Sequence, residues 1–255
     1  MNSTELNKNH YNVGYRKSDI ISLLAHPIIS YDQQSKTKRN YSAIKNLLKL
    51  KKRDLENIKY LDYGFGLGSL LIRMRKVNAL YGIEISTEAI KNLNIINSIR
   101  NIKMLLFEGN ELSNQFSNLK FDIISCSHVL EHIDNDIGLL KLFYNHIDNG
   151  GFLLLNLPIN EIWDDPKHVK KYTVENSVRI VEAAGFEIVE TKTCDRLTAY
   201  ILKIKLTNQN TFILLIIKII SAILALLPIK LWNLFEFLLP KQYMCQQLII
   251  TAQKK

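Results

Sequence analysis

From Ile58 onward, short apolar runs alternate with helical stretches, and this alternation is the feature that most constrains the fold. A β-α alternation of this kind predicts an α/β fold with a doubly wound, mostly parallel sheet, here of seven strands. Right-handed crossovers then bring the carboxyl ends of the strands to one ligand-binding edge. The predicted strands are IKYLDYG, ALYGIEI, KMLLFEG, FDIISCS, GGFLLLNLP and FEIVETKT, with a last strand in MCQQLIITAQKK.

Composition divides the chain into four parts. Residues 1–57 are polar and basic and predict an N-terminal helical arm, and residues 58–210 contain the alternating core. Residues 211–240 are almost entirely apolar and predict a helical insertion, after which residues 241–255 supply the last strand of the sheet. Apolar residues make up 47% of the 255, which is enough to bury a core and excludes bulk disorder.

The net charge of +9 is concentrated in one stripe, where residues 36–59 hold nine basic side chains and two acidic ones. Such a stripe attracts phosphate, on nucleic acid or on anionic lipid, although a solvated helix face gives the same pattern.

The three cysteines form no CxxC pair, which indicates a reducing compartment and no structural zinc. Without an apolar secretory segment near residue 1, the expected location is the cytoplasm.

A glycine-rich turn joins the first predicted strand to the following helix, with the pattern Asp62-x-Gly64-x-Gly66-x-Gly68. Glycines allow a tight turn and let a ligand approach without meeting a Cβ atom. A dinucleotide-binding turn would have its third glycine at position 69, which is Ser69. A carboxylate at Asp62 would repel a pyrophosphate but suits a ligand with an ammonium and a sulfonium group. The turn therefore predicts S-adenosylmethionine (SAM) as the ligand.

Glu84 ends the second predicted strand, 22 residues after Asp62. An acid at that place can accept hydrogen bonds from both ribose hydroxyls of a nucleoside. The alternatives are that Glu84 only forms a salt bridge and that the glycines only make a turn. The register between the turn and Glu84 favours a nucleoside site.

Five motifs occur in order within residues 58–194, namely LDYGFGLG, GIEIS, FEGN, FDIISCSHVLEHI and NGGFLLLNLP. In this order and spacing they resemble the class I SAM-dependent methyltransferases, above all the small-molecule group that includes the quinone-biosynthesis enzymes. The resemblance implies that Asp62 and the three glycines hold the methionine part of SAM. It also implies that Glu84 holds the ribose, that Ile85 lines the adenine, and that Asn110 replaces the acid that usually contacts the adenine amino group. Ser125 completes the predicted cofactor-binding set.

Methyl transfer from a sulfonium is an in-line displacement, so the enzyme aligns the acceptor and removes a proton from a hydroxyl or amine nucleophile. His168 is the first candidate for this general base or acceptor contact, and His128 is the second. The segment DDPKHVKKYT around His168 resembles a stretch near the acceptor pocket in the same group. His132, next to Glu131, is expected to anchor a turn. A metal site at Glu131 and His132 is a minor alternative, because the sequence shows only two neighbouring ligands, and no metal is predicted.

The apolar residues 211–240 contain two lysines within the length that a bilayer span requires. A full span would separate the last strand from its sheet. A hairpin that enters one leaflet fits better, with Lys230 and Trp232 near the interface. The alternative is a hydrophobic cover over the active site or a dimer contact.

Together these features predict a methyltransferase that acts on an oxygen, in preference to carbon or nitrogen, of a small or lipid-linked acceptor. We expect a peripheral position on the inner face of the membrane through residues 211–240. Two alternatives stay open. One is an RNA methyltransferase that uses the basic stripe, although the fourth strand lacks an adenine-type motif and a nucleic-acid partner is not expected. The other is a SAM-binding regulatory protein without turnover.

Overall fold

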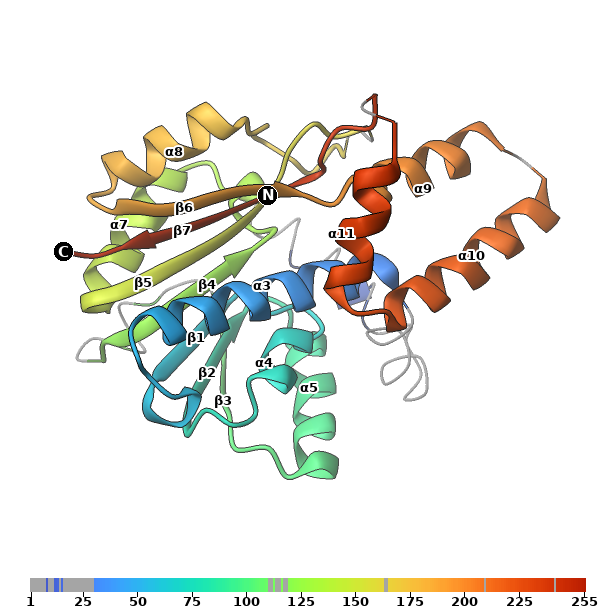
Figure 1. Ribbon diagram of the computed structural model, residues 1–255. Coiled ribbons are helices and arrows are strands. Elements are labelled where there is room, and N and C mark those ends of the chain that lie inside the picture. Colours follow the sequence, from blue (N-terminus) through green and yellow to red (C-terminus); the bar gives the residue numbers. More distant parts are fainter. Residues whose placement is uncertain are drawn as a thin grey trace.

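A mixed sheet of seven strands forms the centre of the computed structural model, in the order β3-β2-β1-β4-β5-β7-β6 (Figure 1). Strands β1 to β5 pair in parallel, and β7 runs antiparallel between β5 and β6. The predicted α/β fold with a mostly parallel, seven-stranded sheet is therefore confirmed. The strands are β1 (Lys59–Tyr63), β2 (Ala79–Glu84), β3 (Leu105–Glu108), β4 (Phe121–Ser127), β5 (Ile147–Pro158), β6 (Glu187–Cys194) and β7 (Gln247–Gln253). The structure describes residues 8, 12, 13, 15, 30–109, 112, 116, 119–162, 165–208, 210–240 and 242–255.

Helices cover both faces of the sheet, because its central strands are apolar on both sides. Within β1, the side chain of Leu61 faces one core cluster and that of Tyr60 faces the other. The first cluster is completed by α7 (Asp136–His146) and α8 (Val174–Ala183), and the second by α3 (Tyr31–Leu50), α4 (Ser69–Arg73) and α5 (Thr87–Arg100). Short 3-10 turns lie at η1 (Leu55–Asn57) and η2 (Leu130–His132).

Local hydrogen bonds fix where two of these helices begin. The hydroxyl of Ser86 accepts from the N–H of Ala89 and starts α5, as the sequence suggests. Thr173 and Asn176 form a reciprocal capping box at the start of α8. Gly185 follows that helix with φ of +103°, the conformation in which a glycine ends a helix most easily.

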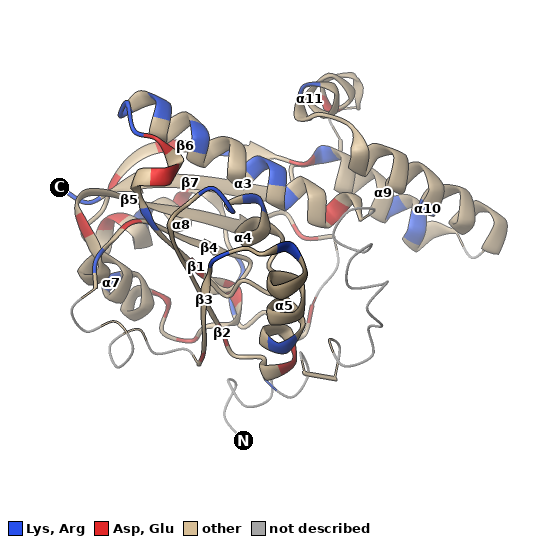
Figure 2. Ribbon diagram, turned by 90° about the horizontal axis from the view of Figure 1, so that it is seen from below, with Lys and Arg blue, Asp and Glu red and all other residues tan. Residues whose placement is uncertain are grey.

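Helix α3 packs against the sheet and carries much of the basic stripe (Figure 2). Two of its basic side chains contact the helices that follow β6: the Lys38 ammonium donates to the carbonyl oxygens of Ala225 (2.7 Å) and Leu227 (2.9 Å). Arg39 is buried and forms an ion pair with Glu236 at 2.5 Å. These two residues thus hold the apolar insertion in place. The domain boundary after residue 57 stays a prediction.

Three helices separate β6 from β7, namely α9 (Arg196–Thr207), α10 (Thr211–Leu226) and α11 (Ile229–Leu238). They project beyond the sheet as a separate lobe (Figures 1 and 2). The insertion thus lies before the last strand, as the sequence indicates, and the helical lobe already begins at Arg196. None of the helices in the described part of the chain has the length and hydropathy needed to cross a bilayer.

The expectation that Trp232 lies near a membrane interface is wrong, because its side chain is 0% exposed. The indole N–H donates to the carbonyl oxygen of Leu224 at 2.7 Å, and the ring packs edge-on against Tyr31 at 5.3 Å. Lys38 also lies over the indole ring, 4.7 Å from its centroid. Trp232 is therefore the core residue of the helical lobe, since an indole buries a large apolar area once its N–H has a partner.

Candidate active site

The carboxyl ends of β1 and β4 place Asp62 directly beside Ser125 in the sheet. The Ser125 hydroxyl donates to Asp62 Oδ1 at 2.6 Å, and the Tyr60 hydroxyl lies 2.6 Å from the same Ser125 oxygen. Burial raises the pKa of Asp62 to about 7, and the nearby Glu84 carboxylate adds to this effect, while the Ser125 hydrogen bond opposes it. Burial disfavours the ionised form of Asp62, and a bound cation would stabilise that form. Asp62 is therefore a suitable partner for a cationic ligand.

Glu84, at the end of β2, is bound by backbone N–H groups. Its carboxylate accepts from Gly66 and Ile85 at 2.8 Å each and from Ser86 at 3.1 Å. Burial raises the pKa of Glu84, and these three hydrogen bonds act against that rise. A carboxylate has about four lone-pair directions, so about one is left for a ribose hydroxyl. Glu84 therefore also holds the glycine turn against β2.

The three glycines of the turn all have left-handed backbones, with φ of +73° at Gly64, +54° at Gly66 and +69° at Gly68. A Cβ atom on Gly64 would lie 2.3 Å from a methyl group of Val129, and one on Gly68 would lie 2.5 Å from Leu93. These two glycines are needed for close packing. Among the residues that the structure describes, a Cβ atom on Gly66 would meet only the Tyr15 hydroxyl, at 3.2 Å. Gly66 therefore leaves open the space that a bound nucleoside needs.

Alanine substitutions should separate these two roles. We expect Gly64→Ala to lower the free energy of unfolding by about 2–5 kcal/mol, because the stiff Val129 side chain cannot rotate away. Gly66→Ala should cost only about 1–2 kcal/mol of stability but should weaken SAM binding by about tenfold or more. Thermal unfolding and calorimetric titration with SAM measure the two effects. Equal stability losses in both variants would contradict this assignment.

Described residues of the N-terminal segment lie along the same edge. Asn12 Oδ1 accepts from the Ser86 hydroxyl at 2.7 Å, and Lys8 pairs with Glu108 at 2.7 Å. With the Tyr15 hydroxyl near Gly66, three positions of this segment border the cofactor edge. The segment carries no motif, so its role is visible only in the structure.

The remaining two predicted cofactor contacts have different outcomes. Ile85 follows Glu84 at the cofactor edge, and its side chain is half-buried. Asn110 lies outside the described residues, so its predicted contact with adenine stays a prediction.

The segment after β4 lies against the glycine turn, because Val129 packs on Gly64. His128 has a left-handed backbone (φ +54°), and its N–H donates to the Asn156 carbonyl oxygen at 2.9 Å. This fixes the imidazole beside Glu131, with 3.5 Å between His128 Nδ1 and Glu131 Oε1. His128, the second candidate base, therefore borders the cofactor edge.

Tertiary folding brings His168, the first candidate base, to the same place. The N–H groups of Val169 and Lys170 donate to the Glu131 carbonyl oxygen at 2.9 and 3.3 Å, which folds this loop over η2. The rings of His132 and His168 then meet edge-on, with centroids 4.9 Å apart. Tyr172, an aromatic residue of the same loop, is buried and donates to Asp136 at 3.0 Å, so it holds the loop.

Burial dominates the protonation of this group of side chains. It raises the pKa of the Glu131 carboxyl to about 8 and lowers the pKa of both His128 and His132. Neutral imidazoles are proton acceptors, which is compatible with the predicted role of His128 as a base. Three groups with shifted pKa values next to a ligand-binding turn are typical of an active site.

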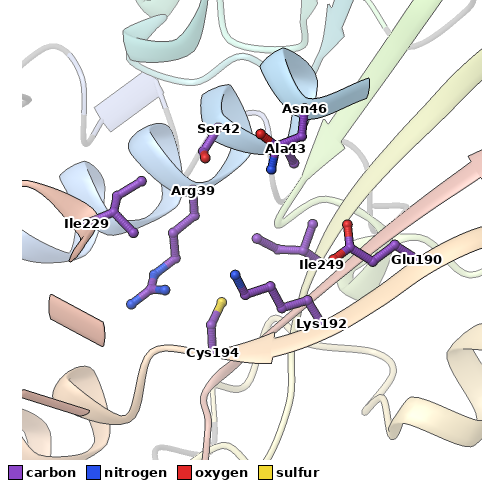
Figure 3. Close-up of a pocket in the computed structure, with 9 residues that line it drawn as sticks. All are labelled: Arg39, Ser42, Ala43, Asn46, Glu190, Lys192, Cys194, Ile229 and Ile249. Atoms are coloured by element: carbon purple, nitrogen blue, oxygen red, sulfur yellow. The ribbon is translucent and has the colours of Figure 1, made fainter. Parts of the chain in front are cut away.

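A separate hollow lies between α3 and the β6–β7 edge of the sheet (Figure 3). In Figure 3, Arg39 and Lys192 point into it from opposite sides, and Cys194 lies between them. None of the predicted cofactor residues lines this hollow. The hollow is therefore not the predicted cofactor site. That site is assigned from the polar side chains and the glycine turn at the strand ends.

Comparisons with known proteins agree with this fold. A family model described as a methyltransferase domain matches residues 35–191, which is more than half of the chain. No curated protein sequence gives a match.

Three solved structures have a similar fold. Magnesium protoporphyrin IX methyltransferase from Synechocystis PCC 6803, with bound SAH, has a TM-score of 0.60 at 13% identity and covers 98% of this chain and 99% of its own. The [4+2]-cyclase SpnF has a TM-score of 0.58 at 18% identity, with 84% and 80% covered. Coclaurine N-methyltransferase has a TM-score of 0.56 at 13% identity, with 84% and 72% covered.

Proposed function

This chain belongs to the methyltransferase-domain family, and from that premise we propose that it transfers the methyl group of SAM to an oxygen of a lipid-linked acceptor at a membrane surface. The observation that supports the acceptor class is the exposed apolar face of the helical lobe. The observation that supports SAM is the pair of buried carboxylates, Asp62 and Glu84, at neighbouring strand ends beside Gly66.

SAM supplies an activated methyl group on a sulfonium, and the residues of this chain bind and orient the reactants. Asp62 would pair with the ammonium group of the methionine part, and Glu84 would accept a hydrogen bond from the ribose. An O–CH3 bond forms on the acceptor as the S–CH3 bond breaks, and the hydroxyl proton passes to a base. His128 and His168 are the candidates for this base, because both belong to the histidine group beside the turn.

The exposed apolar face follows a helical period along α10. Its side chains recur three or four residues apart and all point to solvent, at Phe212, Leu215, Ile216, Ile219, Ile220, Ile223 and Leu226. Helix α11 adds Leu231, Leu234, Phe237 and Leu238, of which Phe237 is 81% exposed. An apolar stripe of this length on a projecting lobe is typical of a surface that enters a membrane.

Basic side chains accompany this stripe. Lys203 and Lys205 on α9, Lys218 on α10 and Lys230 on α11 are all exposed. Lysines beside an apolar helix face bind anionic lipid headgroups while the apolar side chains enter the acyl region. This attachment would bring the enzyme to the membrane that contains a lipid-linked acceptor.

Flotation with liposomes tests the membrane contact. We expect the protein to float with vesicles that contain anionic lipid, and Phe212→Glu combined with Phe237→Glu to reduce partitioning by roughly 100-fold or more. Both side chains are exposed, so the fold should be retained. Ile99→Glu on α5 changes an equally exposed apolar residue away from the lobe and should float normally. Wild-type protein that stays at the bottom with both neutral and anionic vesicles would exclude the membrane contact.

Labelled SAM identifies the acceptor class. After incubation with cell extract, label in the lipid fraction supports the proposal, and label in the RNA fraction supports the alternative. Two cations of the basic stripe, Lys38 and Arg39, already bind internal carbonyl and carboxylate groups, which leaves fewer for RNA. No transfer by wild-type protein, combined with normal SAM binding, would favour the regulatory alternative.

A further inference from the structure

The sequence shows Glu131 and His132 side by side, and the structure adds His168 from 36 residues further along the chain. One ligand atom from each of the three side chains lies within 4.8 Å of the other two. Small side-chain rotations would bring these atoms to separations of about 3.3 Å, which bonds of about 2 Å at tetrahedral angles require. Glu131 and His132 alone supply two ligands, and His168 brings the number to three.

The ring nitrogens are oriented by partners outside the set. His132 Nδ1 lies 3.1 Å from the Lys167 carbonyl oxygen, and its Nε2 lies 4.0 Å from Glu131 Oε1. His168 Nδ1 lies 2.6 Å from Glu161 Oε1, within ion-pair distance although the N–H is not aligned for a hydrogen bond. A carboxylate or carbonyl group on one ring nitrogen, with the other directed to the centre, is the arrangement that metal-binding histidines show.

Glu131 provides the independent observation that a ligand belongs here. Its side chain is 1% exposed, and neither carboxylate oxygen accepts a hydrogen bond from the residues that the structure describes. His128 Nε2 is also buried without such a partner. Buried polar atoms are rarely left in this state, because the lost hydration costs about 1–3 kcal/mol for each group. A cation bound by Glu131 would remove this cost.

The surrounding charges allow a cation. Glu161 and Asp165 both act on the Glu131 carboxylate as like charges. The two nearby ammonium groups each have a carboxylate of their own, at 3.0 Å between Lys36 and Asp32 and at 4.0 Å between Lys167 and Asp165. The Lys36 ammonium also acts on Glu131, as an opposite charge, but it pairs with Asp32 as well, so the carboxyl groups around the imidazoles outnumber the ammonium group that Glu131 meets.

We propose that Glu131, His132 and His168 bind a divalent transition-metal cation, with Glu161 as the group that orients His168. Two imidazoles and one carboxylate suit Zn²⁺, Co²⁺ or Mn²⁺, whereas Mg²⁺ prefers oxygen ligands and keeps its water molecules. Three protein ligands leave a fourth position open, as in catalytic rather than structural sites. If the proposed function holds, this position would bind the acceptor oxygen, since a cation favours the deprotonated hydroxyl. Both ring nitrogens of His168 would then be engaged, which leaves His128 as the candidate base.

Metal binding can be measured without SAM or acceptor, which separates this proposal from the proposed function. The full chain, freed of metal with a chelator, is titrated with Zn²⁺ in competition with a colorimetric chelator and with Co²⁺ by absorption. We expect one equivalent of Zn²⁺, an intense Co²⁺ spectrum typical of four-coordination, and no displacement by a large excess of Mg²⁺. Absence of stoichiometric Zn²⁺ and Co²⁺ binding, or displacement by Mg²⁺, would overturn the proposal.

Variants test the ligand set. Glu131→Gln and His168→Ala should abolish the Co²⁺ spectrum, and Glu161→Gln should weaken Zn²⁺ binding by about 10–100-fold. His146→Ala is the matched control, because His146 is a buried histidine whose Nδ1 contacts Leu142 elsewhere in the fold. Normal SAM binding shows that each variant is folded. Unchanged Zn²⁺ affinity in His168→Ala that binds SAM normally would assign the metal to other residues.

Discussion

Replacing Asp62 with asparagine should weaken SAM binding by about 30–5000-fold. The buried carboxylate of Asp62 is the group that would pair with the ammonium of SAM, and removing one partner of a desolvated charge pair costs about 2–5 kcal/mol. Asparagine keeps the size of the side chain and can still meet the Ser125 hydroxyl. Isothermal titration calorimetry measures the change in Kd.

The same carboxyl group gives SAM binding a dependence on pH. With a pKa of about 7 in the free protein, Asp62 is mostly protonated at about pH 6, and pairing with an ammonium requires the ionised form. Affinity should therefore rise by up to about tenfold between about pH 6 and pH 7.5, with release of a proton on binding. In Asp62→Asn this dependence should shrink to the part that Glu84 contributes, because the pKa of Glu84 is raised as well.

Asp54→Asn is the matched control, because Asp54 is exposed and its side chain makes no capping hydrogen bond. It should bind SAM with unchanged affinity and unchanged pH dependence. Asp62→Asn protein that is folded by thermal unfolding and binds SAM as tightly as wild type would remove the electrostatic basis of the cofactor assignment.

Arg39→Met should lower the free energy of unfolding by about 3–5 kcal/mol. The Arg39 side chain is 3% exposed and that of Glu236 is 11% exposed, so the change leaves a carboxylate buried without its cation. Arg39 also donates to Ser35 of its own helix at 3.1 Å, and its bond to Asn233 at 3.3 Å connects α3 to the helical lobe. Urea unfolding followed by circular dichroism measures the loss.

The cause of this loss can be checked in two ways. Adding Glu236→Leu to Arg39→Met should recover most of the stability, because an apolar pair of similar volume replaces a buried ion pair at little cost. Burial raises the pKa of Glu236 and Arg39 opposes that rise, so the single variant should recover as the pH falls and Glu236 takes up a proton. Lys49→Met on the exposed side of α3 should change stability by no more than about 0.5 kcal/mol. Equal losses in Lys49→Met and Arg39→Met would show that the ion pair is not the cause.

The order of elements and the cofactor edge could be predicted because both are local in sequence. Strand periodicity defined the seven strands, and parallel strands bring Asp62 and Ser125 to the same edge whatever the details of packing. Gly64 and Gly68 were assigned to the cofactor from the pattern alone. Their contacts with Val129 and Leu93 show a packing requirement that the pattern does not distinguish from ligand binding.

The sequence by itself determined the α/β fold, the cofactor edge and an apolar insertion before the last strand, since hydrophobic period and glycine spacing act over a few residues. Only the tertiary structure decided which distant side chains meet. It buried Trp232 against Tyr31, paired Arg39 with Glu236, and placed His168 beside Glu131 and His132. Such contacts depend on how loops and helices pack across the sheet, and no local pattern encodes that packing.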